Sequence, residues 1–197
     1  INCTHTHTSY RITGTSDQGD DNDIFLARLY QQFADCAQFA FEDLKPCTLK
    51  IACGEAKDVG FIRRYRMKDG TAKTNPGVNN PDIVAPIGTT DERVHVLRFD
   101  REGTDSILLI NFANHPDVVG GNGISGDWPS MTRRFTEKAL DDVKCIVFNG
   151  AQGDVNHVNV FAQGGDHNDM FHDFDDVDRG YGHARHMGNV MTAAVLQ

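Results

Sequence analysis

The 197-residue sequence has few basic residues and no long apolar run, and each absence excludes a class of protein. Lysine and arginine total 19 against 28 aspartates and glutamates, which gives a net charge of −9. The densest basic stretch is IRRYR at residues 62–66. A nucleic-acid-binding protein needs an extended positive surface to contact phosphates, so we expect no nucleic-acid partner. A membrane-spanning helix needs about 20 apolar residues, and the sequence contains no such transmembrane segment.

Cysteine is also scarce, and its pattern argues against a disulfide framework. The five cysteines are Cys3, Cys36, Cys47, Cys53 and Cys145. Their number is odd, and most of them lie in apolar segments, so we expect free and buried thiols. Cys47 and Cys53 stand too far apart for a CxxC metal-binding motif.

The hydrophobic periodicity predicts an α/β fold with a mixed β-sheet core flanked by helices. Helices are expected over residues 23–44, 126–140 and 177–197. Strands are expected over residues 1–4, 47–56, 93–100, 107–112 and 143–148. The turn REGTD predicts a β-hairpin between the third and fourth of these strands. Residues 56–92 contain three prolines and are expected to form a long irregular excursion.

The same patterns predict which side chains are buried. Strand 47–56 alternates and should be half-buried, and the all-apolar strand 107–112 should be buried on both faces. Asp127 is the expected N-cap of helix 126–140. The expected buried stripe of that helix is Met131, Phe135 and Ala139, and that of helix 23–44 is Leu26, Leu29, Tyr30, Phe33, Ala37, Ala40 and Leu44.

His5 and His7 form the first candidate site. In a strand, residues i and i+2 share a face and lie about 6–7 Å apart, so both imidazoles could reach one ion. Histidine is a common zinc ligand. The alternative is that both are hydrogen-bonded histidines at the end of a strand.

The second candidate site is His115, which follows strand 107–112 in the motif Asn-His-Pro. Functional groups of open α/β sheets gather where central strands end, so this histidine favours a metal site together with the first pair. The alternative is a histidine that caps a proline turn.

Two further groups carry candidate residues. Gly150 and Gly153 allow a sharp turn after strand 143–148, which would present Asp154, Asn156 and His157 at its tip. A cluster of arginines, Arg63, Arg64 and Arg66, could bind a carboxylate or stabilise an oxyanion, although such clusters are more often solvated. The acidic stretch 164–178 lacks EF-hand spacing, which favours a solvated loop over a calcium site.

Four motifs together resemble the neutral/alkaline (non-lysosomal) ceramidase family, in its N-terminal catalytic domain. They are THTHTS at 4–9 against the family's THTHSG-type motif, NFANHP at 111–116, FNGAQGDVNHVN at 148–159 against a GDxSPN-type loop, and NDMF at 168–171. They occur in the family's order and at similar spacing across nearly the whole chain.

The resemblance implies a hydrolase that uses one zinc ion to cleave the amide bond of ceramide or a related small amphiphilic substrate. It implies that His5 and His115 are zinc ligands and that His7 is a catalytic residue beside the metal, or a third ligand. It also implies that Arg63 faces the site, with Asp154 and Asn156 in the adjoining loop. Zinc-activated water would attack the polarised carbonyl.

The chain departs from the family at two points. Asn156 occupies the position of a serine to which the family assigns a catalytic role, and His157 follows in place of proline, so no serine nucleophile is available there. A relative that is non-catalytic, or that cleaves an ester or another amide, is therefore the alternative.

The family's other ligands, a glutamate and a tyrosine, lie downstream of the last helix. We therefore expect residues 1–197 to be a single piece from the centre of a larger catalytic domain. Two histidines make an incomplete zinc site, so the piece alone should bind zinc weakly, if at all, and be inactive. The motifs predict neither the oligomeric state nor the cellular location.

Overall fold

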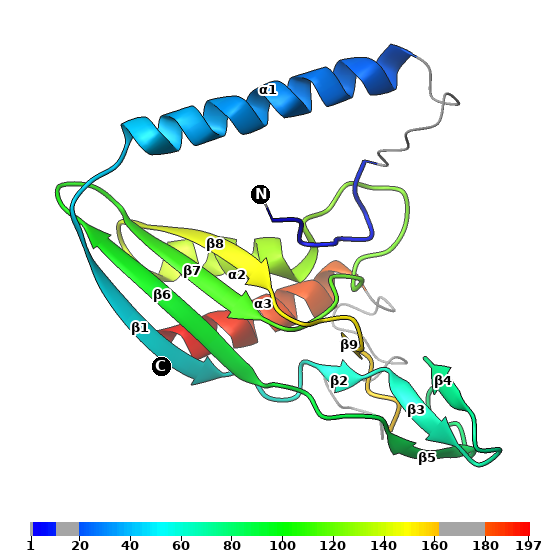
Figure 1. Ribbon diagram of the computed structural model, residues 1–197. Helices are drawn as coiled ribbons and strands as arrows, with labels where there is room; N and C mark the ends of the chain where they lie inside the picture. Colours follow the sequence, from blue (N-terminus) through cyan, green and yellow to red (C-terminus); the bar gives the residue numbers. More distant parts are fainter. Residues whose placement is uncertain (1, 11–19, 162–179) are drawn as a thin grey trace.

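The computed structural model describes residues 2–10, 20–161 and 180–197, and Figure 1 shows their arrangement. These residues form a mixed β-sheet flanked by helices, which confirms the predicted α/β class. The helices are α1 (Asp20–Glu42), α2 (Asp127–Ala139) and α3 (Tyr181–Leu196). The strands are β1 (Cys47–Glu55), β2 (Phe61–Ile62), β3 (Arg64–Met67), β4 (Ala72–Thr74), β5 (Ile83–Pro86), β6 (Arg93–Arg101), β7 (Ser106–Phe112), β8 (Val143–Asn149) and β9 (Val155–Asn156).

A four-stranded sheet with the order β1-β6-β7-β8 forms the centre of the molecule. Strands β6 and β7 pair antiparallel, which confirms the predicted hairpin, and its turn contains Gly103 at φ 69°. Strands β7 and β8 are parallel, and α2 lies in the crossover that a parallel pair requires. The two parallel strands end side by side, with Phe112 opposite Asn149. The loops that follow both strands therefore begin at the same edge of the sheet.

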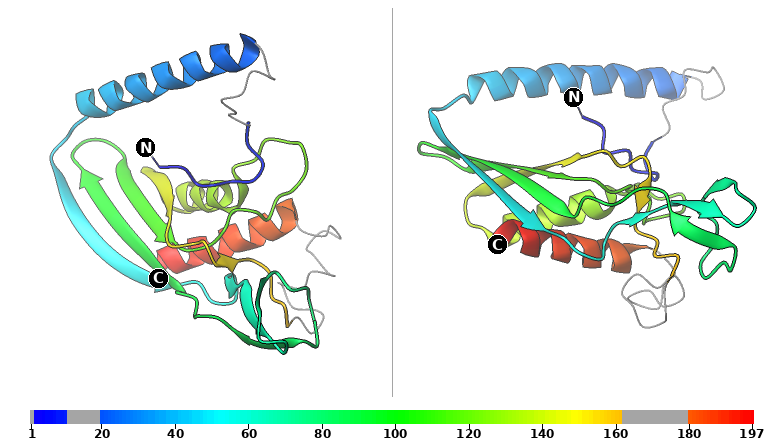
Figure 2. Two further views of the ribbon diagram at one scale, coloured as in Figure 1. Left: turned by 45° about the vertical axis from the view of Figure 1, so that its right-hand side comes forward. Right: turned by 60° about the horizontal axis from the view of Figure 1, so that its bottom comes forward.

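Helices α2 and α3 cover one face of this sheet (Figure 2). Alternate residues of β7 point into the covered core, where Leu108, Ile110 and Phe112 are at most 2% exposed. Helix α3 lies so close to β1 that a Cβ on Gly54 would come within 2.0 Å of the carbonyl oxygen of Ala194. The other buried apolar side chains of this core include Val94, Val96, Val118, Trp128, Val143, Cys145, Val147, Met187 and Met191.

The opposite face of the sheet, here called the outer face, is open to solvent. The prediction of a half-buried β1 is wrong, because Gly54 is the only buried residue of that strand. Ile51 is 75% exposed and Leu49 is 50% exposed. The prediction that β7 is buried on both faces is wrong for the same reason, since Ile107 and Leu109 are only half-buried. Within the part of the chain that the structure describes, no helix packs on this face.

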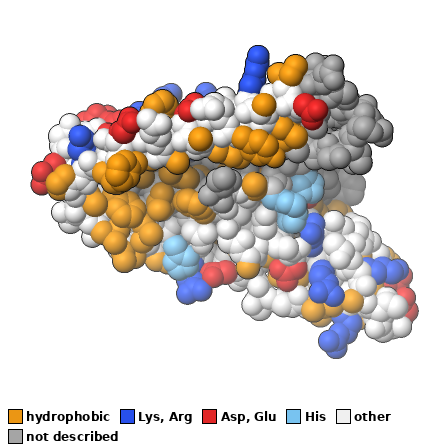
Figure 3. Space-filling model, turned by 45° about the horizontal axis from the view of Figure 1, so that its top comes forward, with side chains coloured by type: hydrophobic (Ala, Val, Ile, Leu, Met, Phe, Trp, Pro, Cys, Tyr) orange, Lys and Arg blue, Asp and Glu red, His pale blue; other side chains and the backbone are white. Residues whose placement is uncertain are grey.

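Helix α1 is present as predicted, but its apolar stripe is not buried. Tyr30 is 63% exposed and Phe33 is 37% exposed, and no side chain described on this helix is buried. An ion pair of 2.5 Å between Asp43 and Arg101 joins the end of the helix to the sheet. Figure 3 shows hydrophobic side chains gathered along α1 and on the molecule's surface beneath it. The periodicity predicted the helix correctly, whereas burial depends on a packing partner.

Residues 56–92 are more ordered than predicted. Strands β4, β3 and β5 form a second sheet in that order, and β2 pairs with β9. In β3, Tyr65 and Met67 are buried while Arg64 and Arg66 are exposed. Tyr65 and Met67 form a small second core with Val160. Short strands around prolines and asparagines have little periodicity of their own, which explains why the sequence did not reveal them.

Helix α2 begins and packs differently from the prediction. Gly126 is its N-cap, and Asp127 is the first helical residue, so the predicted cap is displaced by one position. Its buried side chains include Trp128, Thr132 and Thr136. The predicted stripe is wrong, because Met131 and Phe135 are only half-buried and Ala139 is exposed. Threonine can be buried on this helix because its hydroxyl finds hydrogen-bond partners nearby. The hydroxyl of Thr132, for example, donates to the carbonyl of Trp128 at 3.0 Å.

Three further expectations can be compared with the structure. All five cysteines are free as predicted, but only Cys145 is buried. Residues 2–4 form no strand. Among the described residues, no helix has the length and apolar character needed to cross a membrane. The acidic stretch 164–178 and the NDMF motif lie outside the described residues.

Candidate metal centre

Three histidines from two distant segments meet at the edge of the sheet where β7 and β8 end. His5, His7 and His115 each offer a ring nitrogen, and these ligand atoms all lie within 4.8 Å of one another. The rings meet edge to face, with centroids 4.9 to 5.3 Å apart. Among the described residues, this three-histidine cluster is the one group of metal-ligating side chains with such spacing.

The N-terminal segment reaches the cluster as a loop and not as a strand, which corrects the predicted strand end. His5 adopts φ 65°, in the left-handed region that residues other than glycine rarely occupy. This backbone bend brings both imidazoles of the HxH motif towards His115. Strained backbone of this kind tends to persist at functional sites, where surrounding contacts hold it in place.

Hydrogen bonds fix the N-terminal segment against the loops that follow β7 and β8. The backbone N–H of His7 donates to the carbonyl of Pro116 at 3.2 Å. The hydroxyl of Thr6 donates to the carbonyl of Ser125 at 2.9 Å, and the side-chain amide of Asn149 donates to the carbonyl of Thr4. These contacts position His5 and His7 from both sides of the motif.

His115 is buried, and its surroundings determine which ring nitrogen is available. Its Nδ1 lies 2.9 Å from the carbonyl oxygen of Gln152. A carbonyl only accepts hydrogen bonds, so Nδ1 carries the proton and Nε2 keeps a free lone pair. Metal-binding histidines commonly donate their second N–H to a carbonyl or carboxylate in this way. The loop after β8 therefore orients His115 for a ligand role.

The electrostatic environment keeps His7 uncharged near neutral pH. Partial burial against the cluster lowers the pKa of His7, and the charges of His115, His5 and Arg63 lower it further. The carboxylate of Asp117 opposes this shift. A neutral imidazole has the lone pair that a metal ligand needs, so the shift of the pKa suits His7 to bind a cation.

Arg63 lies close enough to the cluster for its charge to act on the pKa of His7. The Nε and Nη2 of Arg63 donate to the carbonyl of Gly153 at 3.0 and 2.6 Å. The other two arginines of the cluster, Arg64 and Arg66, occupy the exposed face of β3. The structure therefore separates one arginine near the histidines from two on the surface.

The structure separates Asp154, which lies in the turn after β8, from Asn156. Asn156 belongs to β9 and is 1% exposed. Its side-chain N–H donates to Asn75 Oδ1 at 3.2 Å, and its carbonyl oxygen accepts the N–H of Val158 at 3.0 Å. Asp154 lines a cavity of about 290 Å³ whose lining includes none of the three histidines. The predicted tip is wrong for Asn156 and His157, which are each 1% exposed. Asn156 pairs with Phe61 of β2, and His157 follows it directly.

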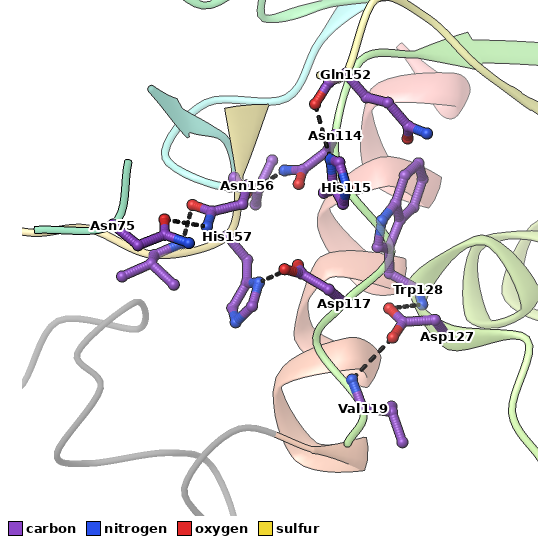
Figure 4. A network of polar contacts seen from close by, with 12 residues as sticks. Asn75, Asn114, His115, Asp117, Val119, Asp127, Trp128, Gln152, Asn156 and His157 are labelled. Atoms are coloured by element: carbon purple, nitrogen blue, oxygen red, sulfur yellow. Dashed lines mark hydrogen bonds and ion pairs between the residues drawn. The ribbon is translucent and has the colours of Figure 1, made fainter. Parts of the chain in front are cut away.

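Sequence reasoning missed a buried polar network next to the cluster (Figure 4). Asp117 Oδ1 lies 3.2 Å from Nδ1 of His157. The Asn114 side chain donates to the carbonyl of Val59 at 2.6 Å, and the Asp127 carboxylate accepts the N–H groups of Val119 and Trp128. A carboxylate two positions after His115 was the signal that could have revealed Asp117.

Comparison with known proteins yields a likeness of fold. No protein-family model matches the chain, and no curated protein matches it. A crystal structure of neutral ceramidase from Pseudomonas aeruginosa matches with a TM-score of 0.50 and 14% identity, and a structure of ceramidase complexed with C2 matches with a TM-score of 0.52 and 16% identity. Each match covers 77% of this chain and 22% of the ceramidase chain. The chain therefore has a ceramidase-like fold, as its motifs predicted, and it spans about a fifth of the length of those structures.

Proposed function

We propose that this chain carries the metal site of a zinc-dependent hydrolase that cleaves an amide bond, with ceramide or a related lipid amide as substrate. The observation that carries the proposal is the convergence of His5, His7 and His115. The ceramidase-like fold supports it, because the neighbours of known structure are named as ceramidases.

The residues present fit a zinc ion. Catalytic zinc sites have three protein ligands and an open position, and the cluster supplies three imidazoles. The hydrogen bond of His115 to Gln152 and the lowered pKa of His7 both favour the neutral, correctly oriented rings that zinc binds. A bound zinc ion would supply acidity to a water molecule and polarise the substrate carbonyl.

Arg63 and His7 are proposed to form hydrogen bonds with the substrate. Two N–H groups of Arg63 are used on Gly153, which fixes the plane of the guanidinium beside the cluster. Its remaining N–H groups can donate to a carbonyl oxygen that gains negative charge during the reaction. His7 is exposed, and when one of its ring nitrogens binds zinc the other carries a proton and can donate a hydrogen bond to the substrate.

Asn156 supplies no nucleophile in this proposal. Both ends of its amide are hydrogen-bonded, and the side chain is buried. Its role is to hold β9 and the following His157 in place. The proposed reaction therefore uses water and not a side chain to attack the substrate.

The test assays a protein that carries this chain together with the glutamate and tyrosine ligands that the resemblance implies. Hydrolysis of ceramide, a simple amide and a simple ester is measured with and without a chelator. We expect amide hydrolysis that the chelator abolishes and added zinc restores. His115→Ala should abolish it, whereas His95→Ala removes an exposed histidine outside the cluster and should not. Hydrolysis that is insensitive to the chelator, or confined to the ester, would contradict the proposal.

A further inference from the structure

A buried histidine and a partly buried carboxylate form a pair next to the three-histidine cluster. Nδ1 of His157 and Oδ1 of Asp117 are 3.2 Å apart, and the two side chains are 1% and 13% exposed. On its other side, the ring of His157 meets the ring of His183 edge to face, with centroids 5.2 Å apart. A carboxylate so little exposed to water needs a partner that compensates for the lost hydration, and His157 supplies it.

Backbone hydrogen bonds connect the segments of Asp117 and His157 to the three-histidine cluster. His7 donates its N–H to the carbonyl of Pro116, the residue before Asp117. His115 donates its N–H to the carbonyl of Val155, two residues before His157. A shift of either member of the pair would therefore move a segment that holds one of the candidate ligands.

Asp117 lies two positions after His115 in the loop that follows β7, so it places a negative charge near the cluster. Three neutral imidazoles bring no charge to a divalent cation, and Arg63 contributes a repulsive one. A carboxylate near the cluster, held in one orientation, offsets that repulsion without occupying a ligand position.

We propose that Asp117 is a positioning residue of the three-histidine site and that His157 holds its carboxylate in place. This inference rests on the proposed function, because it assumes that the histidines bind a cation. Residues that lie next to metal ligands without binding the metal orient those ligands and adjust the affinity for the metal. The inference assigns this role to Asp117 and His157.

The experiment compares zinc affinity across matched variants of the chain, by competition with a chromophoric chelator. Asp117→Asn keeps an acceptor for His157 but removes the charge, and it should weaken zinc binding by about 10–100-fold. His157→Leu keeps the charge but removes the hydrogen bond from the imidazole to the carboxylate, and it should weaken binding as well. His157→Asn places an amide N–H close to the position of Nδ1 and should restore most of the loss.

Two controls separate positioning from general damage. Asp141→Asn removes an exposed carboxylate at the far end of β8 and should leave the zinc affinity unchanged. The double variant Asp117→Asn/His157→Leu should bind zinc almost as well as whichever single variant binds it less tightly. The effects of mutating two partners of one pair are not additive. The absorption spectrum of bound Co²⁺ should change in the weakened variants, which a purely structural role would not require.

The outcomes distinguish this inference from the proposed function. A parent chain that binds zinc through its three histidines, but whose affinity is the same in Asp117→Asn and in His157→Leu, contradicts the positioning role alone. A parent chain that binds no zinc contradicts both. If Asp117→Asn fails to fold, the comparison of His157→Leu with His157→Asn provides the same test, because recovery in the latter requires the hydrogen bond to Asp117.

Discussion

One short segment, residues 110–115, contributes both to the helix-covered face of the sheet and to the three-histidine end of the same sheet. Ile110 and Phe112 are 0% and 2% exposed in the apolar core. His115 is 5% exposed only three residues further, but it is buried among polar partners. On the covered face, burial of apolar area stabilises the fold. At the end of the strand, each buried polar atom needs a specific partner, so the arrangement favours binding over stability.

The largest loss of stability is expected from a substitution on the helix-covered face. Ile110→Ala leaves a cavity in the core between β7 and the helices and should lower the free energy of unfolding by about 2–5 kcal/mol. Ile51→Ala makes the same change on the outer face, where the side chain is 75% exposed, and should have little effect. Urea unfolding of both variants measures the difference. Equal losses would show that the outer face is covered in solution.

A smaller loss of stability is expected at Asp127, where the helix-covered core meets the loops of the three-histidine end. Asp127 is 0% exposed, and its carboxylate accepts the N–H groups of Val119 and Trp128 at 2.8 and 2.6 Å. Asp127→Asn turns an NH₂ group towards one of these donors and should lower the free energy of unfolding by about 1–3 kcal/mol.

Asp141→Asn is the matched control, since its carboxylate is exposed, and it should behave as the parent chain. A parent-like Asp127→Asn in urea unfolding would show that this carboxylate does not tie the loop after β7 to α2.

The smallest effect on stability is expected from His7 and depends on pH. The pKa of His7 is lowered in the folded chain, so on acidification the unfolded chain binds the proton first. His7 therefore destabilises the fold as pH falls below about 6.5, the ordinary pKa of histidine. Without zinc, the parent chain should lose more stability between pH 8 and pH 5.5 than His7→Gln does. Identical pH profiles in chemical unfolding would mean that His7 is not held in the cluster.

The comparison also shows what could be predicted from the sequence. Alternation and apolar runs predicted the hairpin of β6 and β7, strand β8 and helix α3, because these elements bury long periodic segments. The same reasoning failed for β1, since an alternating pattern does not show which face acquires a partner. It also failed for β3 to β5, where the strands are short.

At the site, the residue types were predictable but the geometry was not. The motifs identified His5, His7 and His115, and the structure brings all three together. The left-handed bend at His5 could not be foreseen, because its cause is the set of contacts that Thr4, Thr6 and His7 make with remote loops. The pairing of Asp117 with His157 likewise depends on loops that follow two different strands.

The most direct test of the account is a zinc titration of the chain and its histidine variants. With His7 as a third imidazole, the cluster has as many protein ligands as a catalytic zinc site. We therefore expect the chain to bind one zinc ion measurably, but more weakly than a site that also has the glutamate and tyrosine ligands. His5→Ala, His7→Ala and His115→Ala should each abolish this binding, and His95→Ala should leave it intact. A chain that takes up no zinc, or that keeps its affinity after loss of any one of the three histidines, would contradict the central claim.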